Sequence, residues 1–296
     1  MIMKERIEVP YCSGREVPVF DLPKNACDTH FHIFDPVHFP YKSEDVRNQP
    51  PATVDCYRML MRHMGIERCV IVNPSCYGVD NSCTISALRQ FGDCARAVVV
   101  IDKDTPMDLL KKWDEYGVKG IRFNLVSGSL EQMEQAMSLS EKVAKLGWHT
   151  QFFMSPDITV KMEKELQSYP TAVVLDHMGH LPADIGIRHE AYEIMLSLIH
   201  AKKAYVKLSG FYINSRQKDL GDMLEIGQSF MKDAPEGLLW GTDWPHHHCW
   251  YRHEPMPDDA YMLDGIMQGC DSECIQEQIL VKNPELLYGF KRAGNL

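Results

Sequence analysis

Three histidines and one aspartate stand in short motifs that could act together on a polar ligand. The motifs are Asp28-Thr29-His30-Phe31-His32, Asp176-His177-Met178-Gly179-His180 and Gly241-Thr242-Asp243-Trp244-Pro245. Alternation along a strand points residues i and i+2 to one side, so His30 and His32 can enter one cavity. Such side chains can bind a divalent metal. Without a metal, they can polarise a carbonyl while the carboxylate deprotonates water.

Eight apolar, β-branched segments predict the strands that would position these residues. The segments are 26–34, 69–73, 97–101, 120–125, 149–154, 172–176, 205–208 and 238–241. Helical spacing lies between them at 54–64, 129–146, 189–202 and 220–231, and Asn283-Pro284 predicts an N-cap before a final helix at 285–290. Alternating strands and helices, with eight strands, favour an α/β fold made of a single (β/α)8 TIM barrel. A barrel gathers the carboxyl ends of its strands at one face, where we expect the site.

The composition narrows the class of protein. The 296 residues suit one barrel domain spanning 1–296, and no linker or repeat predicts a second domain. A formal net charge of -10 argues against nucleic acid or an anionic membrane as a partner. The sequence has no signal-peptide core and no apolar run of about 20 residues, so we expect a cytoplasmic protein. Its ten cysteines lack paired zinc-ligand spacing, and we expect free thiols.

Several other residues have both a structural and a functional interpretation. Arg122, on the fourth predicted strand, cannot bind a metal, but its planar fork suits a carboxylate. His149 begins the fifth strand, at the end opposite the expected site, and we interpret it as structural or surface-exposed. The histidines at 246, 247, 248 and 253 fall in a predicted loop at 246–259 and are interpreted as solvated, with one member able to line the mouth of the site. Ser75 ends the second strand and either caps a turn or contacts substrate.

Six ordered segments carry a resemblance that covers nearly the whole chain. They are 28–34, 70–78, 120–124, 176–179, 240–246 and 283–288. On these motifs the chain resembles the 2-pyrone-4,6-dicarboxylate lactonase group, a metal-independent branch of the amidohydrolase superfamily. The resemblance implies a hydrolase that opens a small carboxylate-bearing lactone. By that similarity, the carbonyl is held by His30, His32 and His177, water is activated by Asp243, and a substrate carboxylate is bound by Ser75 and Arg122.

The chain also departs from the pattern of that group. The group's second arginine falls on Gly128, the arginine after the seventh strand falls at about Ile213, and a binding tyrosine is replaced by Phe153. Each lost charged hydrogen bond to a buried carboxylate costs roughly 1.5 to 3 kcal/mol. We therefore expect a lactone with one carboxylate or sulfonate, or a sugar-acid lactone.

Three further residues complete the expected substrate-binding set. Arg47 lies in an extended loop predicted at 41–53, near the place of another family tyrosine, and could restore one cation. His246 and His248 follow Asp243 directly along the chain. We expect all three to lie at the mouth of the barrel.

Three alternatives remain open at the level of sequence. A metal-dependent decarboxylase of the same superfamily would hold Zn or Mn at His30, His32, His177 and Asp243. A lactone isomerase would use closely related chemistry, and a catalytically dead barrel would serve as a binding protein. We expect no metal cofactor, a small-molecule lactone as the partner, and no nucleic-acid or membrane partner. The oligomeric state is left open, with a homo-oligomer as one option.

Overall fold

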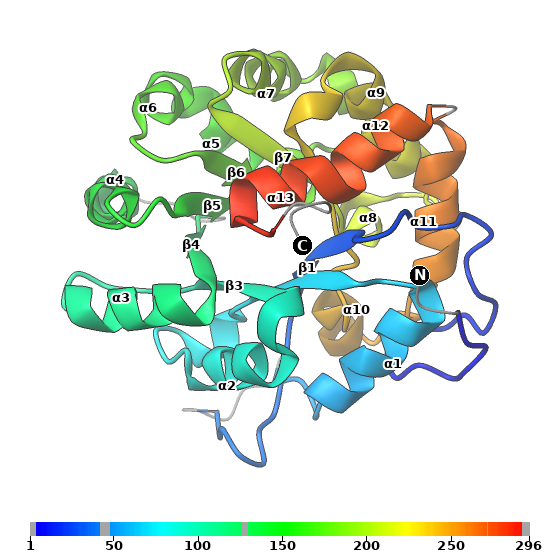
Figure 1. Ribbon diagram of the computed structural model, residues 1–296. Helices are drawn as coiled ribbons and strands as arrows, with labels where there is room; N and C mark the ends of the chain where they lie inside the picture. The colour runs from blue at the N-terminus through cyan, green and yellow to red at the C-terminus, as the bar shows by residue number, and fades with distance from the viewer. Residues whose placement is uncertain (1–3, 42–47, 126–129, 271, 292–296) are drawn as a thin grey trace.

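Eight parallel strands form a nearly closed barrel with helices around it, in a computed structural model that describes residues 4–41, 48–125, 130–270 and 272–291 (Figure 1). The strands pair in chain order and are β1 (Cys27–Phe31), β2 (Arg68–Val72), β3 (Ala95–Val99), β4 (Val118–Asn124), β5 (His149–Phe153), β6 (Val173–Leu175), β7 (Ala204–Leu208) and β8 (Leu238–Trp240). The predicted TIM barrel is confirmed. Every predicted strand is present, with ends that differ by at most three residues.

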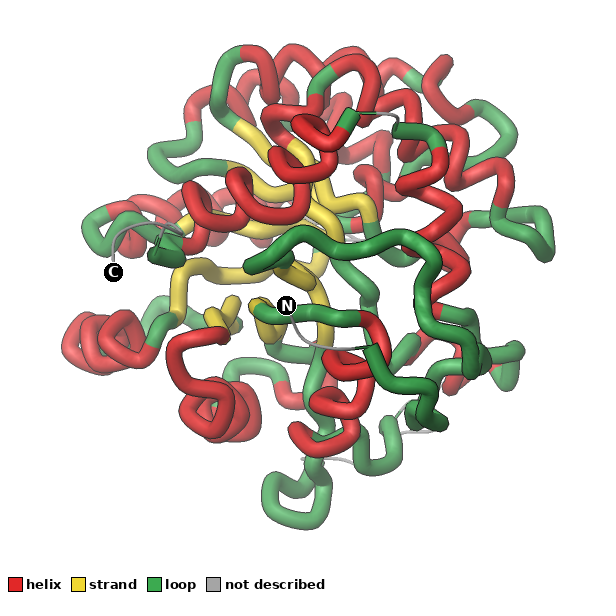
Figure 2. Tube along the Cα trace, turned by 45° about the vertical axis from the view of Figure 1, so that its right-hand side comes forward, coloured by secondary structure: helices red, strands yellow, loops and turns green. Residues whose placement is uncertain are grey.

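The helices lie outside the strands, as the turned view also shows (Figure 2). They are α1 (Val54–Met64), α2 (Ser82–Phe91), α3 (Met107–Tyr116), α4 (Leu130–Ala144), α5 (Pro156–Lys161), α6 (Glu163–Ser168), α7 (Glu190–His200), α8 (Phe211–Asn214), α9 (Gly221–Asp233), α10 (His247–Arg252), α11 (Asp259–Gln268), α12 (Glu273–Glu277) and α13 (Asn283–Tyr288). The helices predicted at 54–64, 189–202 and 220–231 are confirmed as α1, α7 and α9. The helix predicted at 129–146 is confirmed as α4, although residue 129 lies outside the described residues.

Two local predictions were wrong. The segment 246–259 is not a solvated loop: it contains α10, and His246 before that helix is fully buried. Asn283 does not cap the last helix, because a π-helical turn at Gln278–Lys282 runs directly into α13. Its side chain instead donates to the carbonyls of Pro235 and Leu238, and so anchors α13 at the start of β8.

The segment after β8 joins the two ends of the sheet. The hydroxyl of Thr29 donates to the Trp240 carbonyl at 2.8 Å, and the Asp243 amide donates to the His30 carbonyl at 2.8 Å. A Cβ on Gly241 would lie 2.8 Å from the backbone nitrogen of His30, so this close approach requires glycine. The closure therefore brings Asp243 directly against the histidines of β1.

A register shift in β1 aims His30 into the barrel. Cys27 packs with the inward-facing residues of other strands, whereas Phe31 stacks on Tyr57 of α1 outside the barrel, at 3.5 Å between ring centroids. Strict alternation would place residues 27 and 31 on the same face. The pairing of β1 with β2 shifts between Asp28 and Phe31, and this irregularity exchanges the two faces.

The amino-terminal end of the barrel is filled by apolar side chains. Inward residues of five strands pack with two residues from the end of the chain, Tyr288 and Phe290; the inward set is Cys27, Val70, Val72, Val98, Val174 and Leu239. His149 also lies at this end, buried against the Tyr288 ring at 5.2 Å between centroids. The polar site is therefore confined to the opposite end.

The cysteines and the apolar character of the helices agree with what the amino-acid composition predicts. All ten cysteines are free, and half of them are buried. Within the described residues, no helix combines the length and the apolar character needed to cross a membrane.

Candidate active site

The four residues singled out by the sequence meet at the carboxyl end of the barrel. Oδ1 of Asp243 lies 3.5 Å from Nε2 of His30, 3.6 Å from Nε2 of His32 and 4.0 Å from Nε2 of His177. All four side chains are almost completely buried. One carboxylate oxygen thus faces three ring nitrogens, two from the end of β1 and one from the segment just after β6.

The second oxygen of Asp243 is held by a residue that the sequence analysis missed. The hydroxyl of Tyr212, in α8 just after β7, donates to Oδ2 at 2.6 Å. Burial alone would raise the pKa of Asp243, but His177 and the other two histidine rings hold this pKa well below its usual range. Asp243 is therefore an ionised carboxylate with Oδ1 directed at the histidines.

The other ring nitrogen of each histidine has a partner that sets its orientation. Nδ1 of His32 lies 2.8 Å from the Val72 carbonyl, and a carbonyl only accepts, so this nitrogen carries the proton and a neutral His32 presents a bare Nε2. Nδ1 of His177 is 2.9 Å from the Ser209 hydroxyl. Burial lowers the pKa values of His30 and His177 to about 3, so both rings are neutral at pH 7.

A buried charged network supports His30 from below. Oδ2 of Asp176 accepts from Nε of Arg122 at 2.9 Å and from Nε2 of Gln151 at 3.2 Å. Lys207, the penultimate residue of β7, is completely buried and donates to His30, Thr29 and Gln151. Sequence reasoning missed Gln151 and Lys207, because a single polar residue inside an apolar strand does not reveal which way it points.

A second buried carboxylate fixes the closure between β8 and β1. Asp28 accepts from the backbone amides of His30 and Thr242, from the Thr242 hydroxyl at 2.6 Å and from the Tyr57 hydroxyl at 2.9 Å. Burial raises the pKa of Asp28 to about 6 in spite of these donors. Asp28 therefore orients the backbone that carries His30 and Asp243.

A cavity of about 170 Å³ is lined by three of the four residues, His32, His177 and Asp243, whereas His30 is fully buried and does not line it. Its described lining residues are His32, Phe34, Pro74, Ser75, Cys76, Arg122, Asn124, Phe153, His177, Asp243, His247, His248 and Tyr251. Arg122 is the one arginine or lysine among these described residues, and its guanidinium carbon lies 5.2 Å from the centre of the Phe153 ring. The cavity therefore suits a small molecule with one anionic group.

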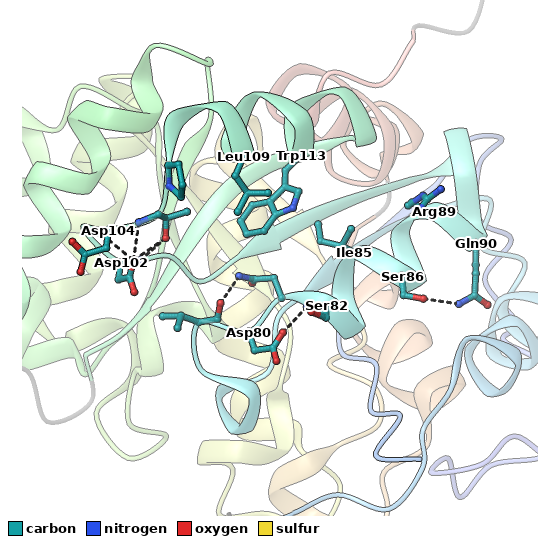
Figure 3. Close-up of a pocket in the computed structure, with 14 residues that line it drawn as sticks. Asp80, Ser82, Ile85, Ser86, Arg89, Gln90, Asp102, Asp104, Leu109 and Trp113 are labelled. Atoms are coloured by element: carbon teal, nitrogen blue, oxygen red, sulfur yellow. Dashed lines mark hydrogen bonds between the residues drawn. The ribbon is translucent and has the colours of Figure 1, made fainter. Parts of the chain in front are cut away.

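A larger hollow of about 920 Å³ lies between α2 and α3 (Figure 3). Its described lining residues, among them Ile85, Asp102 and Trp113, include none of the residues predicted for the site. We therefore place the chemistry in the smaller cavity, where the titratable groups converge.

The predicted substrate-binding residues are only partly brought together. Ser75, Arg122, Phe153 and His248 line the cavity. His246 does not, because its Nε2 lies 3.1 Å from Asp259, away from the cavity. Arg47, together with most of the predicted loop 41–53, lies outside the described residues, as does Gly128.

The wall formed by α10 was not anticipated. His247, His248 and Tyr251 reach the cavity from this short helix, and His247 stacks on Phe34 at 5.5 Å between ring centroids. No strong signal in the sequence predicts this helix. The only hint was the position of the histidine run directly after Asp243.

Three of the four central residues would also fit a divalent metal by position. The ligand atoms of His30, His32 and Asp243 all lie within 4.8 Å of one another, and nitrogen and oxygen ligands of tetrahedral zinc are roughly 3.3 Å apart. Among the described residues, Nε2 of His30 has no hydrogen-bond partner. His30, His32 and Asp243 would hold the ion. Such an ion would polarise a carbonyl and lower the pKa of a bound water.

Comparison with known proteins identifies the family. The family model described as "Amidohydrolase" matches residues 27–290. The chain belongs to the amidohydrolase family. This amidohydrolase is 29% identical to a 2-pyrone-4,6-dicarboxylate hydrolase of Comamonas testosteroni, over 92% of each chain. It is 28% identical to a 4-sulfomuconolactone hydrolase of Rhizobium radiobacter, over 98% of this chain and 99% of the relative.

A solved structure agrees with this assignment. The putative 2-pyrone-4,6-dicarboxylic acid hydrolase of Pseudomonas putida superposes with a TM-score of 0.79 at 25% identity. The match covers 92% of this amidohydrolase and all of that chain. The resemblance inferred from the sequence motifs is thus confirmed.

Proposed function

We propose that this protein is a lactonase that hydrolyses a small lactone bearing one carboxylate or sulfonate. One observation carries the proposal: an ionised carboxylate oxygen lies within 3.5–4.0 Å of three histidine nitrogens, beneath a cavity with one arginine among its described lining residues. The names of the two relatives described above support the choice of a lactone as the substrate.

The residues divide the chemistry among them without a metal. Oδ1 of Asp243 takes one proton of a water while the oxygen of that water bonds to the lactone carbonyl carbon. The bare Nε2 of His32 accepts the other hydrogen bond of this water and orients it. His30 and His177 stabilise the negative charge that develops on the carbonyl oxygen.

Ring opening then returns the proton. The tetrahedral intermediate collapses, the bond between the carbonyl carbon and the ring oxygen breaks, and Asp243 gives its proton to that oxygen. Water has then supplied a hydroxyl to the new carboxyl group and a hydrogen to the leaving oxygen. An enolate leaving group is a weak base, which lessens the need for a metal ion.

The cavity sets the class of substrate. A volume of about 170 Å³ accommodates one small ring, and Arg122 with Ser75 offers a place for one anion. Arg122 is already bonded through Nε to Asp176, which fixes the plane of the guanidinium. A guanidinium whose plane is already fixed loses less conformational entropy when it binds a carboxylate in a bidentate way.

The test is a panel of lactones that share one ring and carry zero, one or two anionic groups, assayed in heavy-oxygen water. We expect ring opening to be fastest with one anionic group, with one heavy oxygen entering the new carboxylate. No ring opening across the panel would refute the proposal. Interconversion of lactones without label would indicate an isomerase, and release of carbon dioxide from aromatic acids would indicate a decarboxylase.

A further inference from the structure

We propose that Lys207 is a positioning residue that holds His30 in the tautomer with its proton on Nε2. The proposal deepens the lactonase function above and rests on it for its catalytic consequence. The tautomer itself can be measured without any substrate.

Three acceptors surround the ammonium group of Lys207. Nζ of Lys207 lies 2.9 Å from the Thr29 carbonyl, 2.9 Å from Oε1 of Gln151 and 3.1 Å from Nδ1 of His30. A lysine ammonium carries three N–H donors and no acceptor. Three acceptors for three protons satisfy the group completely, in a place where no part of Lys207 reaches solvent.

The direction of the hydrogen bond between Lys207 and His30 decides which ring nitrogen carries the proton. Because the ammonium can only donate, Nδ1 of His30 must accept, and the single proton of the neutral ring lies on Nε2. Oδ1 of Asp176 lies 3.2 Å from the same Nδ1 but, among the described residues, has no hydrogen-bond partner. Asp176 is thus near enough to receive an Nδ1 proton, and the ammonium of Lys207 opposes this by donating to the same nitrogen.

The protonated Nε2 of His30 lies beside the carboxylate of Asp243. Nε2 of His30 is buried, without a hydrogen-bond partner in the described part of the chain, and lies 3.5 Å from Oδ1 of Asp243. It is therefore a buried donor held beside the base, and the carboxylate of that base lines the cavity. His32, fixed through Val72, presents the opposite tautomer two residues away.

This assignment separates two kinds of chemistry at one set of residues. A histidine that binds a metal through Nε2 must have that nitrogen bare and carry its proton on Nδ1. With Lys207 donating to Nδ1, His30 serves as a hydrogen-bond donor and not as a metal ligand. In this arrangement, Lys207 competes with Asp176 for the same ring nitrogen.

The decisive measurement uses the unmutated protein. In protein labelled with nitrogen-15 at histidine, a long-range proton–nitrogen correlation spectrum at neutral pH reports which ring nitrogen carries the proton. His30→Gln assigns the signals. We expect a bare Nδ1 and a protonated Nε2 at His30. A protonated Nδ1, whether caused by Asp176 or by a metal at Nε2, would overturn the proposal.

Variants then test the cause. In Lys207→Met we expect the proton to move to Nδ1, with Asp176 as its acceptor, and kcat to fall by about 10²-fold or more with KM unchanged. Gln151→Met removes another acceptor of the ammonium and should leave the His30 tautomer unchanged, as should Lys203→Met at an exposed position. Retention of the Nε2 proton in a folded Lys207→Met would show that Lys207 does not set the tautomer.

The two proposals can fail separately. The spectrum decides the tautomer even if no lactone is hydrolysed. Conversely, lactone hydrolysis by a protein with an Nδ1 proton on His30 would leave the proposed function standing and remove this inference.

Discussion

The Tyr212 hydroxyl donates a 2.6 Å hydrogen bond to Oδ2 of Asp243 and leaves Oδ1 facing three histidine nitrogens. One oxygen of the carboxylate is thereby anchored while the other faces the cavity. The base of the proposed reaction is therefore one atom with a fixed orientation, Oδ1 of Asp243.

Asp243→Asn should lower kcat by about 10²- to 10⁴-fold, because the amide cannot take a proton from water. Substrate affinity, measured by calorimetry with the inactive variant, should stay close to that of the wild type. Asp108→Asn, at an exposed position on α3, is the matched control. Wild-type turnover by the Asp243→Asn protein would remove this carboxylate from the mechanism.

Tyr212→Phe should lower kcat by about 10- to 100-fold and leave KM unchanged. A hydrogen bond to a charged group is worth roughly 1.5 to 3 kcal/mol, and its loss frees the carboxylate to rotate. Steady-state kinetics on one lactone measures the effect. A change confined to KM would instead indicate that Tyr212 contacts substrate.

Arg122→Lys should raise KM for an anionic lactone by about 10- to 100-fold, because the ammonium lacks the fixed fork that binds a carboxylate. A neutral lactone of the same ring should show little change. Arg89→Lys is the control, since Arg89 also lies over an aromatic ring, that of Tyr116 at 5.4 Å, but outside the active-site cavity. Equal effects on charged and neutral lactones would contradict an anion-binding role for Arg122.

Treatment with a chelator should leave kcat unchanged, and elemental analysis should show less than stoichiometric zinc or manganese. The reason is that base, acceptor and donors are all supplied by Asp243, His32, His30 and His177. Activity that is lost with the chelator and restored by either metal would favour metal-assisted hydrolysis by the same four residues.

Acid should destabilise the protein partly through His149. Burial, and next the positive charge of Lys207, lower the pKa of His149 from 6.5 to about 3 in the folded state. Between these values the unfolded chain binds a proton that the folded chain does not. The free energy of unfolding therefore falls with decreasing pH, by up to about 1.4 kcal/mol per pH unit for this group.

His149→Gln should make the pH dependence of unfolding shallower between about pH 6 and 4, as measured by urea denaturation. His38→Gln, at an exposed histidine, controls for the substitution itself. An unchanged slope in His149→Gln would mean that His149 is protonated in the folded state.

The sequence predicted the barrel because its signals are local and repeated. Each strand is a short apolar run, and alternation with helical segments restricts the sheet to parallel pairing. The same logic placed His30, His32, His177 and Asp243 at one face, since the carboxyl ends of all strands meet there.

The parts that could not be predicted depend on contacts between distant segments. Lys207 and Gln151 look like interruptions of apolar strands until the barrel places both below His30. The register shift in β1 changes the face of the sheet on which Phe31 lies, and the residue types at 27–31 do not predict this shift. The helix α10 forms from a histidine-rich stretch with weak helical propensity, so its neighbours rather than its own residues decide its conformation.

Asp176 gives the molecule a practical constraint for protein engineering. One oxygen of its carboxylate accepts a hydrogen bond from Arg122, which we expect to bind the substrate's anionic group. The other oxygen lies 3.2 Å from Nδ1 of His30, which we expect to act on the carbonyl. Replacing Arg122 with a residue that cannot donate to Asp176 would therefore disturb turnover along with selectivity. Redesign for new lactones is better begun on α10. Its side chains line the cavity, and the described hydrogen bonds and ion pairs of Asp176 involve none of them.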